Sequence, residues 1–374
     1  MRKVMDMPQA SECIDSRQRT GQPWNDMHLE ALESMSSLRG DERGKGSMLS
    51  KASQVFILTD ENVAPFWLPE VEYWLGCENA IEIVIRPGEQ HKKLQTVQRV
   101  WKTLMKHHAD RNSLMINLGG GTITDLGGFA ASTYKRGIKF INVPTTLLGM
   151  IDASIGGKTG IDFGGAKNQI GTFAEAEEVI VDPVFLETLP QRELLSGLAE
   201  MLKYGFIADA KLLEANLENY QDYVLRAGEI KREIVAQDPT EKGLRKVLNF
   251  GHTLGHAIES HCLTTDYPLF HGEAVALGTL GALWLSVKQS GLDEQVLKDY
   301  ETKLPMLLSE AQITLSEADI EPILVYLAYD KKNKGEKPQF VLLEAIGRPV
   351  WDVMVDNDTI KRSLEYIINE YGKQ

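Results

Sequence analysis

The chain has 374 residues, of which 43% are hydrophobic and 25% are charged, and both values are ordinary for a globular protein. This length predicts two folded lobes and excludes a mini-protein stapled by disulfides. The formal net charge of -13 argues against general affinity for nucleic acid or for an anionic membrane. A local basic cluster must therefore hold any anionic ligand.

The cysteines are Cys13, Cys77 and Cys262, and their spacing fits neither a CxxC pair nor a metal site. They predict no disulfide framework and suit a reducing cytoplasm. The longest nearly apolar run, residues 274–287, is shorter than the about 20 residues of a membrane span, so we interpret it as a buried helix. No apolar segment follows the first residues, which predicts no secretory signal.

Residues 1–50 are rich in Ser, Arg, Asp, Glu and Gly and show no sustained periodicity. Such a segment buries too little apolar surface to offset its ordering entropy, so we expect a disordered N-terminal extension. The rest of the chain divides into residues 51–183 and residues 184–374.

Short β-rich runs alternate with helical patterns through residues 51–183. Strands are expected at 54–58, 80–85, 113–118, 140–143 and 179–181, and helices near 94–107 and 124–134. This alternation predicts an α/β nucleotide-binding domain with a mostly parallel, Rossmann-like sheet. Ligands of such sheets bind beyond the carboxyl ends of the strands.

Helical periodicity dominates residues 184–374, which predicts a mostly α-helical C-terminal domain. Helices are expected at 191–206, 210–219, 227–237, 243–260, 273–289 and 293–309, with one late strand at 339–343. A cleft between the two lobes is a preferred place for a ligand.

The apolar run that ends at Leu118 leads into Gly119-Gly120-Gly121 and then into a helical pattern. A strand, a glycine turn and a helix start can present backbone N–H groups to a pyrophosphate. The spacing is not strict GxGxxG, and the glycines could serve only a tight turn and close packing. Two other polar groups, Asp60 to Asn62 and Thr145-Thr146, also follow predicted strands, although each alone suits a cap or turn.

Four of the eight histidines lie within residues 252–271. His252 and His256 are four residues apart on one predicted helical face, and His271 follows. Two imidazoles and one carboxylate with an open position suit a catalytic zinc or a similar ion. Glu200 is the best carboxylate because its predicted helix is mostly apolar. The alternative is a core histidine pair, with Glu200 bound only to Lys203.

His261 and the pair His107-His108 are expected to face solvent. Basic residues recur beside glycines and polar turns, as in Gly156-Gly157-Lys158-Thr159-Gly160. A single such lysine commonly marks a solvated face, whereas a converging set would hold phosphate and carboxylate groups.

Taken together, these segments resemble the 3-dehydroquinate synthases, a family of sugar-phosphate cyclases, from about residue 52 onward. The strongest parts are 119–125, 143–148, 152–171, 197–205, 248–259 and 271–275. The resemblance implies NAD and one divalent metal, zinc or cobalt, as cofactors. It assigns the metal to Glu200, His252 and His271.

The resemblance also implies the other site residues. Catalytic candidates are His256, Glu241, Lys158, Lys203, Arg245 and Asn249, the first two as acid-base groups and the last four also as substrate ligands. Substrate ligands are Arg136, Asp152, Asn168, Lys231 and one of Lys331 and Lys332. NAD ligands are Asp60, Asn62, Glu89, Lys92, Gly120, Gly121, Thr122, Asp125, Thr145, Thr146, Lys167, Phe185 and Thr188.

The implied reaction converts 3-deoxy-D-arabino-heptulosonate 7-phosphate into 3-dehydroquinate and phosphate, through transient oxidation, elimination, re-reduction and aldol closure. The alternatives are another sugar-phosphate cyclase, a metal-dependent polyol dehydrogenase and a non-catalytic NAD-binding protein. We expect a cytoplasmic homodimer whose partner is a small anionic sugar phosphate, with no nucleic acid or membrane.

Overall fold

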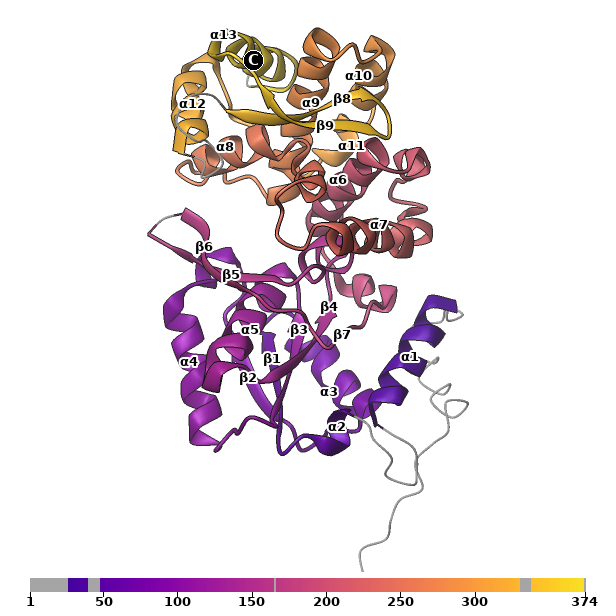
Figure 1. Cartoon of the computed structure of the whole chain (residues 1–374), viewed down its shortest axis with the longest axis vertical. Coiled ribbons are helices and arrows are strands. Elements are labelled where there is room, and N and C mark those ends of the chain that lie inside the picture. Colours follow the sequence, from indigo (N-terminus) through magenta and orange to yellow (C-terminus); the bar gives the residue numbers. More distant parts are fainter. Residues whose placement is uncertain (1–25, 40–47, 165, 330–337, 373–374) are drawn as a thin grey trace, which may run out of the picture. The chain divides into compact units, whose positions relative to one another are not determined.

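The structure is a computed structural model that describes residues 26–39, 48–164, 166–329 and 338–372. The chain forms two compact units (Figure 1). The first contains residues 1–145 and 157–188, and the second contains residues 146–156 and 189–374. Residues 146–156 therefore belong to the second unit although they lie within the first part of the sequence.

A five-stranded parallel sheet forms the centre of the first unit, in the order β2-β1-β3-β4-β7. Its strands are β1 (Val55–Asp60), β2 (Ile81–Ile85), β3 (Leu114–Gly119), β4 (Lys139–Pro144) and β7 (Glu178–Val179). Side chains alternate across a strand, so Phe56 and Leu58 lie on one face, in the core that also contains residues of α4 (Leu94–Lys106) and α5 (Gly121–Thr133).

The remaining elements of the first unit include several that we did not predict. They are α1 (Asp26–Arg39), α2 (Met48–Lys51), α3 (Ala64–Leu75), the short helices η2 (Glu89–His91), η3 (Tyr134–Arg136) and η5 (Pro183–Thr188), and the antiparallel hairpin of β5 (Lys158–Phe163) and β6 (Ala166–Phe173). The expectation of disorder throughout residues 1–50 is wrong for residues 26–39, whose helix buries Met35 and Leu38, and for residues 48–50, which lie in α2. Residues 1–25 and 40–47 lie outside the described residues.

The second unit is mostly helical. Its helices are α6 (Gln191–Ile207), α7 (Val224–Gln237), α8 (His252–Cys262), α9 (His271–Gln289), α10 (Glu294–Glu301), α11 (Leu304–Leu307), α12 (Ile320–Tyr329) and α13 (Asn357–Tyr371). Short helical turns are η4 (Gly149–Ala153), η6 (Ala210–Glu214), η7 (Tyr220–Tyr223), η8 (Leu244–Asn249) and η9 (Glu317–Asp319), and β8 (Gln339–Ala345) pairs with β9 (Arg348–Met354).

The helix expected over 243–260 is broken, and the break sets the start of α8. Gly251 adopts a φ of 77°, a left-handed conformation that favours glycine. A Cβ at this position would lie 2.3 Å from the Thr279 Oγ1 atom. Only η8 precedes the break, and α8 starts at His252 with its first turn at the candidate metal site.

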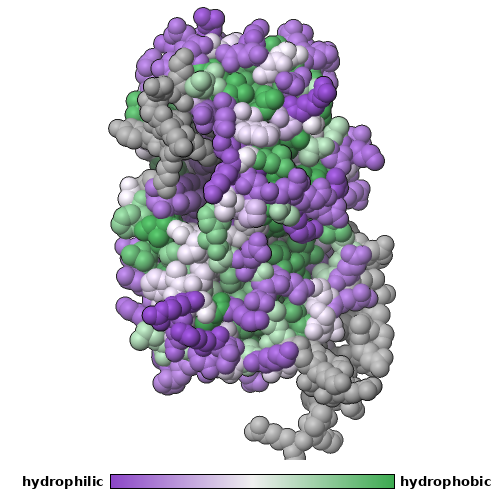
Figure 2. Space-filling model, viewed as in Figure 1, coloured by the Kyte–Doolittle hydropathy of each residue, from purple (hydrophilic) through white to green (hydrophobic). Residues whose placement is uncertain are grey.

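The predicted fold class is confirmed: an α/β unit with a parallel sheet and a mostly helical second unit. Hydrophilic side chains are spread over the visible face (Figure 2), as a charged fraction of 25% implies. Among the described residues, no helix is both long enough and apolar enough to cross a membrane.

Candidate active site

In the first unit, buried Lys92 joins two other predicted NAD ligands to Asn168, a predicted substrate ligand. The Lys92 Nζ atom lies 2.6 Å from Asp125 Oδ2, 2.7 Å from Asn168 Oδ1 and 3.4 Å from Glu89 Oε1. Burial lowers the pKa of Lys92, but the charges of Asp125 and Glu89 have the larger, opposite effect, so the pKa lies above its ordinary value. Thr122 donates to Glu89 at 2.7 Å, so the cluster is tied to the first turn of α5.

The glycines around this turn have two different functions. A Cβ at Gly127 would lie 2.0 Å from Asn117 Oδ1, and one at Gly128 would lie 2.5 Å from Thr159 Cγ2. These two glycines are packing residues. Gly120 is the N-cap of α5 and Gly121 is its first residue, and both are partly exposed. The helix therefore begins at the carboxyl end of β3, as predicted, with backbone N–H groups available to an anion.

Other predicted nucleotide residues already make turn contacts. Asp60 accepts the backbone N–H of Asn62 at 2.9 Å, and burial raises the pKa of Asp60. Thr146 accepts the N–H of Gly149 at 3.0 Å. By contrast, the Oγ1 atom of Thr145 is buried and has no hydrogen-bond partner within the described ranges. An unsatisfied buried hydroxyl is costly and fits a site that a polar ligand completes.

Phe185 and Thr188 lie in η5 and contact aromatic side chains of α3. The Phe185 ring is fully buried, with its centroid 5.0 Å from Trp67 and 6.1 Å from Trp74. Thr188 Oγ1 accepts the Trp67 indole N–H at 2.7 Å. The Phe185 side chain is therefore a core group, and only its backbone can face a ligand. Lys167 is half-buried on β6.

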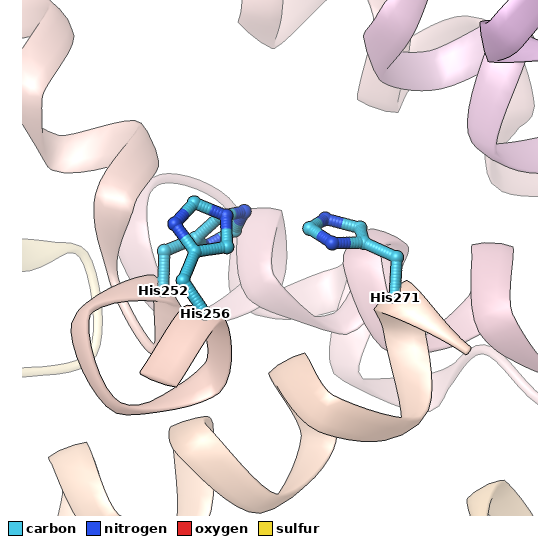
Figure 3. Close-up of side chains that lie close together, drawn as sticks. All are labelled: His252, His256 and His271. Atoms are coloured by element: carbon cyan, nitrogen blue, oxygen red, sulfur yellow. The ribbon is translucent and has the colours of Figure 1, made fainter. Parts of the chain in front are cut away.

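In the second unit, one carboxylate oxygen faces two imidazoles. The Oε1 atom of Glu200, on α6, lies 3.0 Å from His252 Nε2 and 3.2 Å from His271 Nε2. His252 begins α8 and His271 begins α9, and the rings of His252 and His256 face that of His271 (Figure 3). Three residues that are far apart in the sequence are thus brought together, as predicted.

The other ring nitrogens have acceptors that orient both imidazoles. His252 Nδ1 lies 3.0 Å from the Phe250 carbonyl oxygen, and His271 Nδ1 lies 3.4 Å from Glu259 Oε2. A metal-binding imidazole usually donates its second N–H in this way. Burial lowers the pKa of His271, but Glu259 and Glu200 outweigh it and raise that pKa to about 10. Glu259 was not assigned this role, although it follows His252 by seven residues on one helical face.

The spacing of these atoms suits a tetrahedral cation. Ligand bonds of about 2.0–2.1 Å place neighbouring ligand atoms about 3.3–3.4 Å apart in a tetrahedral site. The observed separations of 3.0 and 3.2 Å need to grow by only a few tenths of an ångström. The residues present therefore fit a zinc-like ion.

His256 lies near the same point. Its ring centroid is 5.1 Å from that of His252 and 5.6 Å from that of His271, and the nitrogen ligands of the three histidines lie within 4.8 Å of one another. His256 is half-buried. The geometry therefore allows His256 either to bind a cation or to exchange protons beside it.

Two buried lysines extend the cluster. Lys203 Nζ lies 2.6 Å from Glu200 Oε2 and 3.1 Å from Asp152 Oδ2. Lys231 donates to the Asp152 carbonyl oxygen at 2.6 Å and pairs with its carboxylate. Burial raises the pKa of Glu200, but Lys203 and His252 hold it well below its ordinary range. The pairing of Glu200 with Lys203 and its contact with the histidines coexist, because they use different oxygens.

The remaining polar candidates of this unit contact one another or the backbone. Arg245, which is 2% exposed, donates to the carbonyl oxygens of Pro239 at 2.7 Å and Gly156 at 2.9 Å. Asn249 donates to Glu241 Oε1 at 2.7 Å. The acid-base candidate Glu241 thus has a fixed amide partner.

Other predicted positions lie outside these two clusters or outside the described residues. Lys158 is an exposed residue at the start of β5. Arg136 lines a surface hollow of about 530 Å³ in the first unit. Lys331 and Lys332 fall outside the described residues. The expectation that His261 faces solvent is wrong, because it is buried and lies 2.8 Å from Asp319.

Family models match both parts of the chain. One described as the N-terminal part of 3-dehydroquinate synthase matches residues 82–196, and one described as its C-terminal part matches residues 197–333. The chain belongs to the 3-dehydroquinate synthase family. The 3-dehydroquinate synthase of Parabacteroides distasonis is 38% identical over 335 residues, which cover 86% of this chain and 93% of that protein. The family resemblance seen in the sequence is confirmed.

Solved structures of related cyclases share the fold. A 2-epi-5-epi-valiolone synthase from Streptomyces hygroscopicus subsp. jinggangensis, with NAD+ and Zn2+ bound, is 27% identical with a TM-score of 0.75, and the match covers 87% of this chain and 94% of that one. A 2-deoxy-scyllo-inosose synthase gives a TM-score of 0.76 at 24% identity, covering 90% of this chain and 94% of that one. This second likeness supports the fold class alone.

Proposed function

We propose that this member of the 3-dehydroquinate synthase family converts 3-deoxy-D-arabino-heptulosonate 7-phosphate into 3-dehydroquinate and phosphate in the shikimate pathway. The reaction would make it a phosphate-eliminating carbon–oxygen lyase. The assignment of a metal site rests on one observation: the Nε2 atoms of His252 and His271 both lie close to one buried oxygen of Glu200. The family match supports the choice of substrate.

Different residues would hold the two cofactors. Glu200, His252 and His271 would bind one divalent ion, zinc or cobalt, while the first turn of α5 and the unsatisfied Thr145 hydroxyl would bind NAD. When bound, NAD supplies a reversible hydride acceptor and the ion supplies Lewis acidity at a substrate oxygen. The zinc and NAD in the Streptomyces relative support this pair of cofactors.

The chain's own residues would orient the substrate and move protons. Lys203 holds the second oxygen of Glu200, which fixes the carboxylate while its first oxygen faces the imidazoles. His256 is half-buried beside both imidazoles, and Asn249 donates to Glu241. These contacts support a proton-exchange role for each, and such a role is worth about 10²- to 10⁴-fold in rate. Lysines near the phosphate would stabilise the charge of the leaving group.

A direct assay distinguishes this reaction from its rivals. The purified chain, incubated with the heptulosonate phosphate, NAD+ and Zn2+, should release phosphate and 3-dehydroquinate in equal amounts with no net NADH. Net NADH formation would indicate a polyol dehydrogenase. Turnover of glucose 6-phosphate or a heptulose phosphate in preference to the carboxylate-bearing substrate would indicate another cyclase.

A matched pair of variants tests the centre itself. Glu200→Gln should lose bound zinc and most of the activity, because the neutral amide is a poor metal ligand. Glu294→Gln, on the exposed face of α10, should keep both. Zinc bound normally by Glu200→Gln would contradict the ligand assignment. The homodimer and the cytoplasmic location stay predictions.

A further inference from the structure

Helix α1 buries a regular stripe of its residues in the first unit. His28, Ala31, Met35 and Leu38 are between 0% and 5% exposed, and their spacing of three or four residues places them on one helical face. This face packs against α3 and η5. The N-terminal helix is therefore an integral part of the nucleotide-binding unit.

A buried hydrogen bond connects α1 to Asp182, the residue that precedes η5. His28 Nδ1 lies 2.6 Å from Asp182 Oδ2, and the side chains are 3% and 0% exposed. The other oxygen of Asp182 accepts the backbone N–H of Val184 at 3.0 Å. Burial raises the pKa of Asp182 above its ordinary value, although the hydrogen bond with His28 opposes this shift. The Asp182 carboxylate thus forms hydrogen bonds both with His28 of α1 and with the first turn of η5.

Aromatic contacts complete the attachment of η5. The His28 ring lies edge-on to Trp74 at 5.8 Å, and Trp74 in turn contacts Phe185. Trp67 packs on Phe185 and donates to Thr188. The segment that contains two predicted NAD positions is therefore held between α3 and the carboxylate that α1 binds.

A second contact ties α1 to the weakest strand of the sheet. β7 has two residues and pairs only with β4 among the strands of the sheet that the structure describes. Ser34 of α1 donates to the side chain of Glu178, the first residue of β7. The short edge strand and the η5 segment that follows it share the same support.

We infer that α1 is a positioning element of the NAD site: His28 acts through Asp182 to hold η5 in the conformation that binds the dinucleotide. The inference rests on the proposed function for its ligand. It predicts that losing the His28 contact mobilises η5 and weakens NAD binding, while residues of the second unit keep their affinity for zinc.

The experiment compares His28→Ala with Glu33→Ala, a change on the exposed face of the same helix. Hydrogen exchange without NAD should show the amides of residues 183–188 exchanging about tenfold faster or more in His28→Ala, because a buried side-chain hydrogen bond is lost. The Kd for NAD should rise by a similar factor, and the KM for NAD should rise more than kcat falls. Glu33→Ala should behave like the wild type.

The remaining outcomes are also decisive. His28→Asn, whose amide can donate in place of the Nδ1–H group, should recover much of the protection and of the NAD affinity. Unchanged exchange in His28→Ala, or faster exchange with an unchanged Kd for NAD, would overturn the inference. If the chain starting at Met48 binds NAD like the full chain, the inference also fails. A wild type that binds no NAD would refute the proposed function instead.

Discussion

The contact between α6 and α9 offers the sharpest test of how the metal residues are held. Gly272 follows His271 directly, and its N–H donates to Ser196 Oγ at 2.9 Å. In Gly272→Ala, the new Cβ would lie 2.0 Å from the Ser196 carbonyl oxygen. Because this neighbour is backbone, the two helices must separate to relieve the contact.

The size of the separation follows from the structure. An ordinary Cβ contact begins near 3.4 Å, so the displacement needed is about 1.4 Å, the difference between 3.4 and 2.0 Å. Metal sites tolerate about 0.2 Å in ligand distance, and α6 and α9 each carry a predicted ligand. Overpacking of this kind costs about 1–3 kcal/mol of stability. Zinc affinity should fall by about 10–100-fold, as it does when the support of a ligand is removed.

Gly228→Ala is the matched control. A Cβ there, in helix α7, meets its nearest neighbour at 3.4 Å, so alanine should raise the free energy of unfolding by about 0.4–1 kcal/mol. Denaturant unfolding of the metal-free proteins and zinc titration against a chelator measure both quantities. If Gly272→Ala unfolds and binds zinc like the wild type, α6 and α9 are not held as described.

Two further changes probe the electrostatics of the second unit. Glu259→Gln removes the charge that faces His271 Nδ1 and should weaken zinc binding about 10–100-fold. The far-ultraviolet circular dichroism should change little. Zinc affinity equal to that of the wild type would show that the Glu259 carboxylate does not support the ligand. Asp152 has a pKa below its ordinary value, because Lys203 and Lys231 outweigh the effect of burial. The ionised carboxylate therefore stabilises the fold at neutral pH. This contribution is lost progressively as the pH falls below about 5. Asp152→Asn should therefore cost about 1.5–3 kcal/mol at pH 7 and clearly less at about pH 2–3 in denaturant unfolding, and a constant difference would contradict the pairing.

The central sheet could be predicted because its strands carry their own signal. The residues of β3 are all buried, and such a strand reads as a continuous apolar run. The β5–β6 hairpin has no such signal, because glycine, lysine and asparagine interrupt it and its stability comes from pairing and from packing on α5. Helix α1 was missed for a similar reason. Its buried stripe includes an alanine and a histidine, and the burial of the histidine depends on its contact with Asp182 of the same unit.

The sequence predicted which residues form the metal site but not which atoms each of them contacts. The spacing of His252 and His256 and an acid on an apolar helix indicated a metal centre, and the structure places Glu200 against two imidazoles. The sequence could not show which atoms orient the rings. The Phe250 carbonyl oxygen has no side-chain signal, and Glu259 resembles any acid on a helix until α9 places His271 beside it.

The choice of third ligand depends on charge more than on distance. All three histidines can reach a common point, so geometry alone allows a site built from imidazoles only. Such a site would leave Glu200, which is 0% exposed, with Lys203 as its charged partner, and Lys203 is already shared with Asp152. Lys231 also pairs with Asp152, so the two carboxylates and the two ammonium groups balance in charge. Lys203 lies at the Oε2 atom of Glu200, whereas the Oε1 atom faces the two imidazoles, and a divalent ion would give this buried oxygen a positive partner. We therefore expect Glu200 to be the third ligand and His256 to lie beside the ion as the group that exchanges protons.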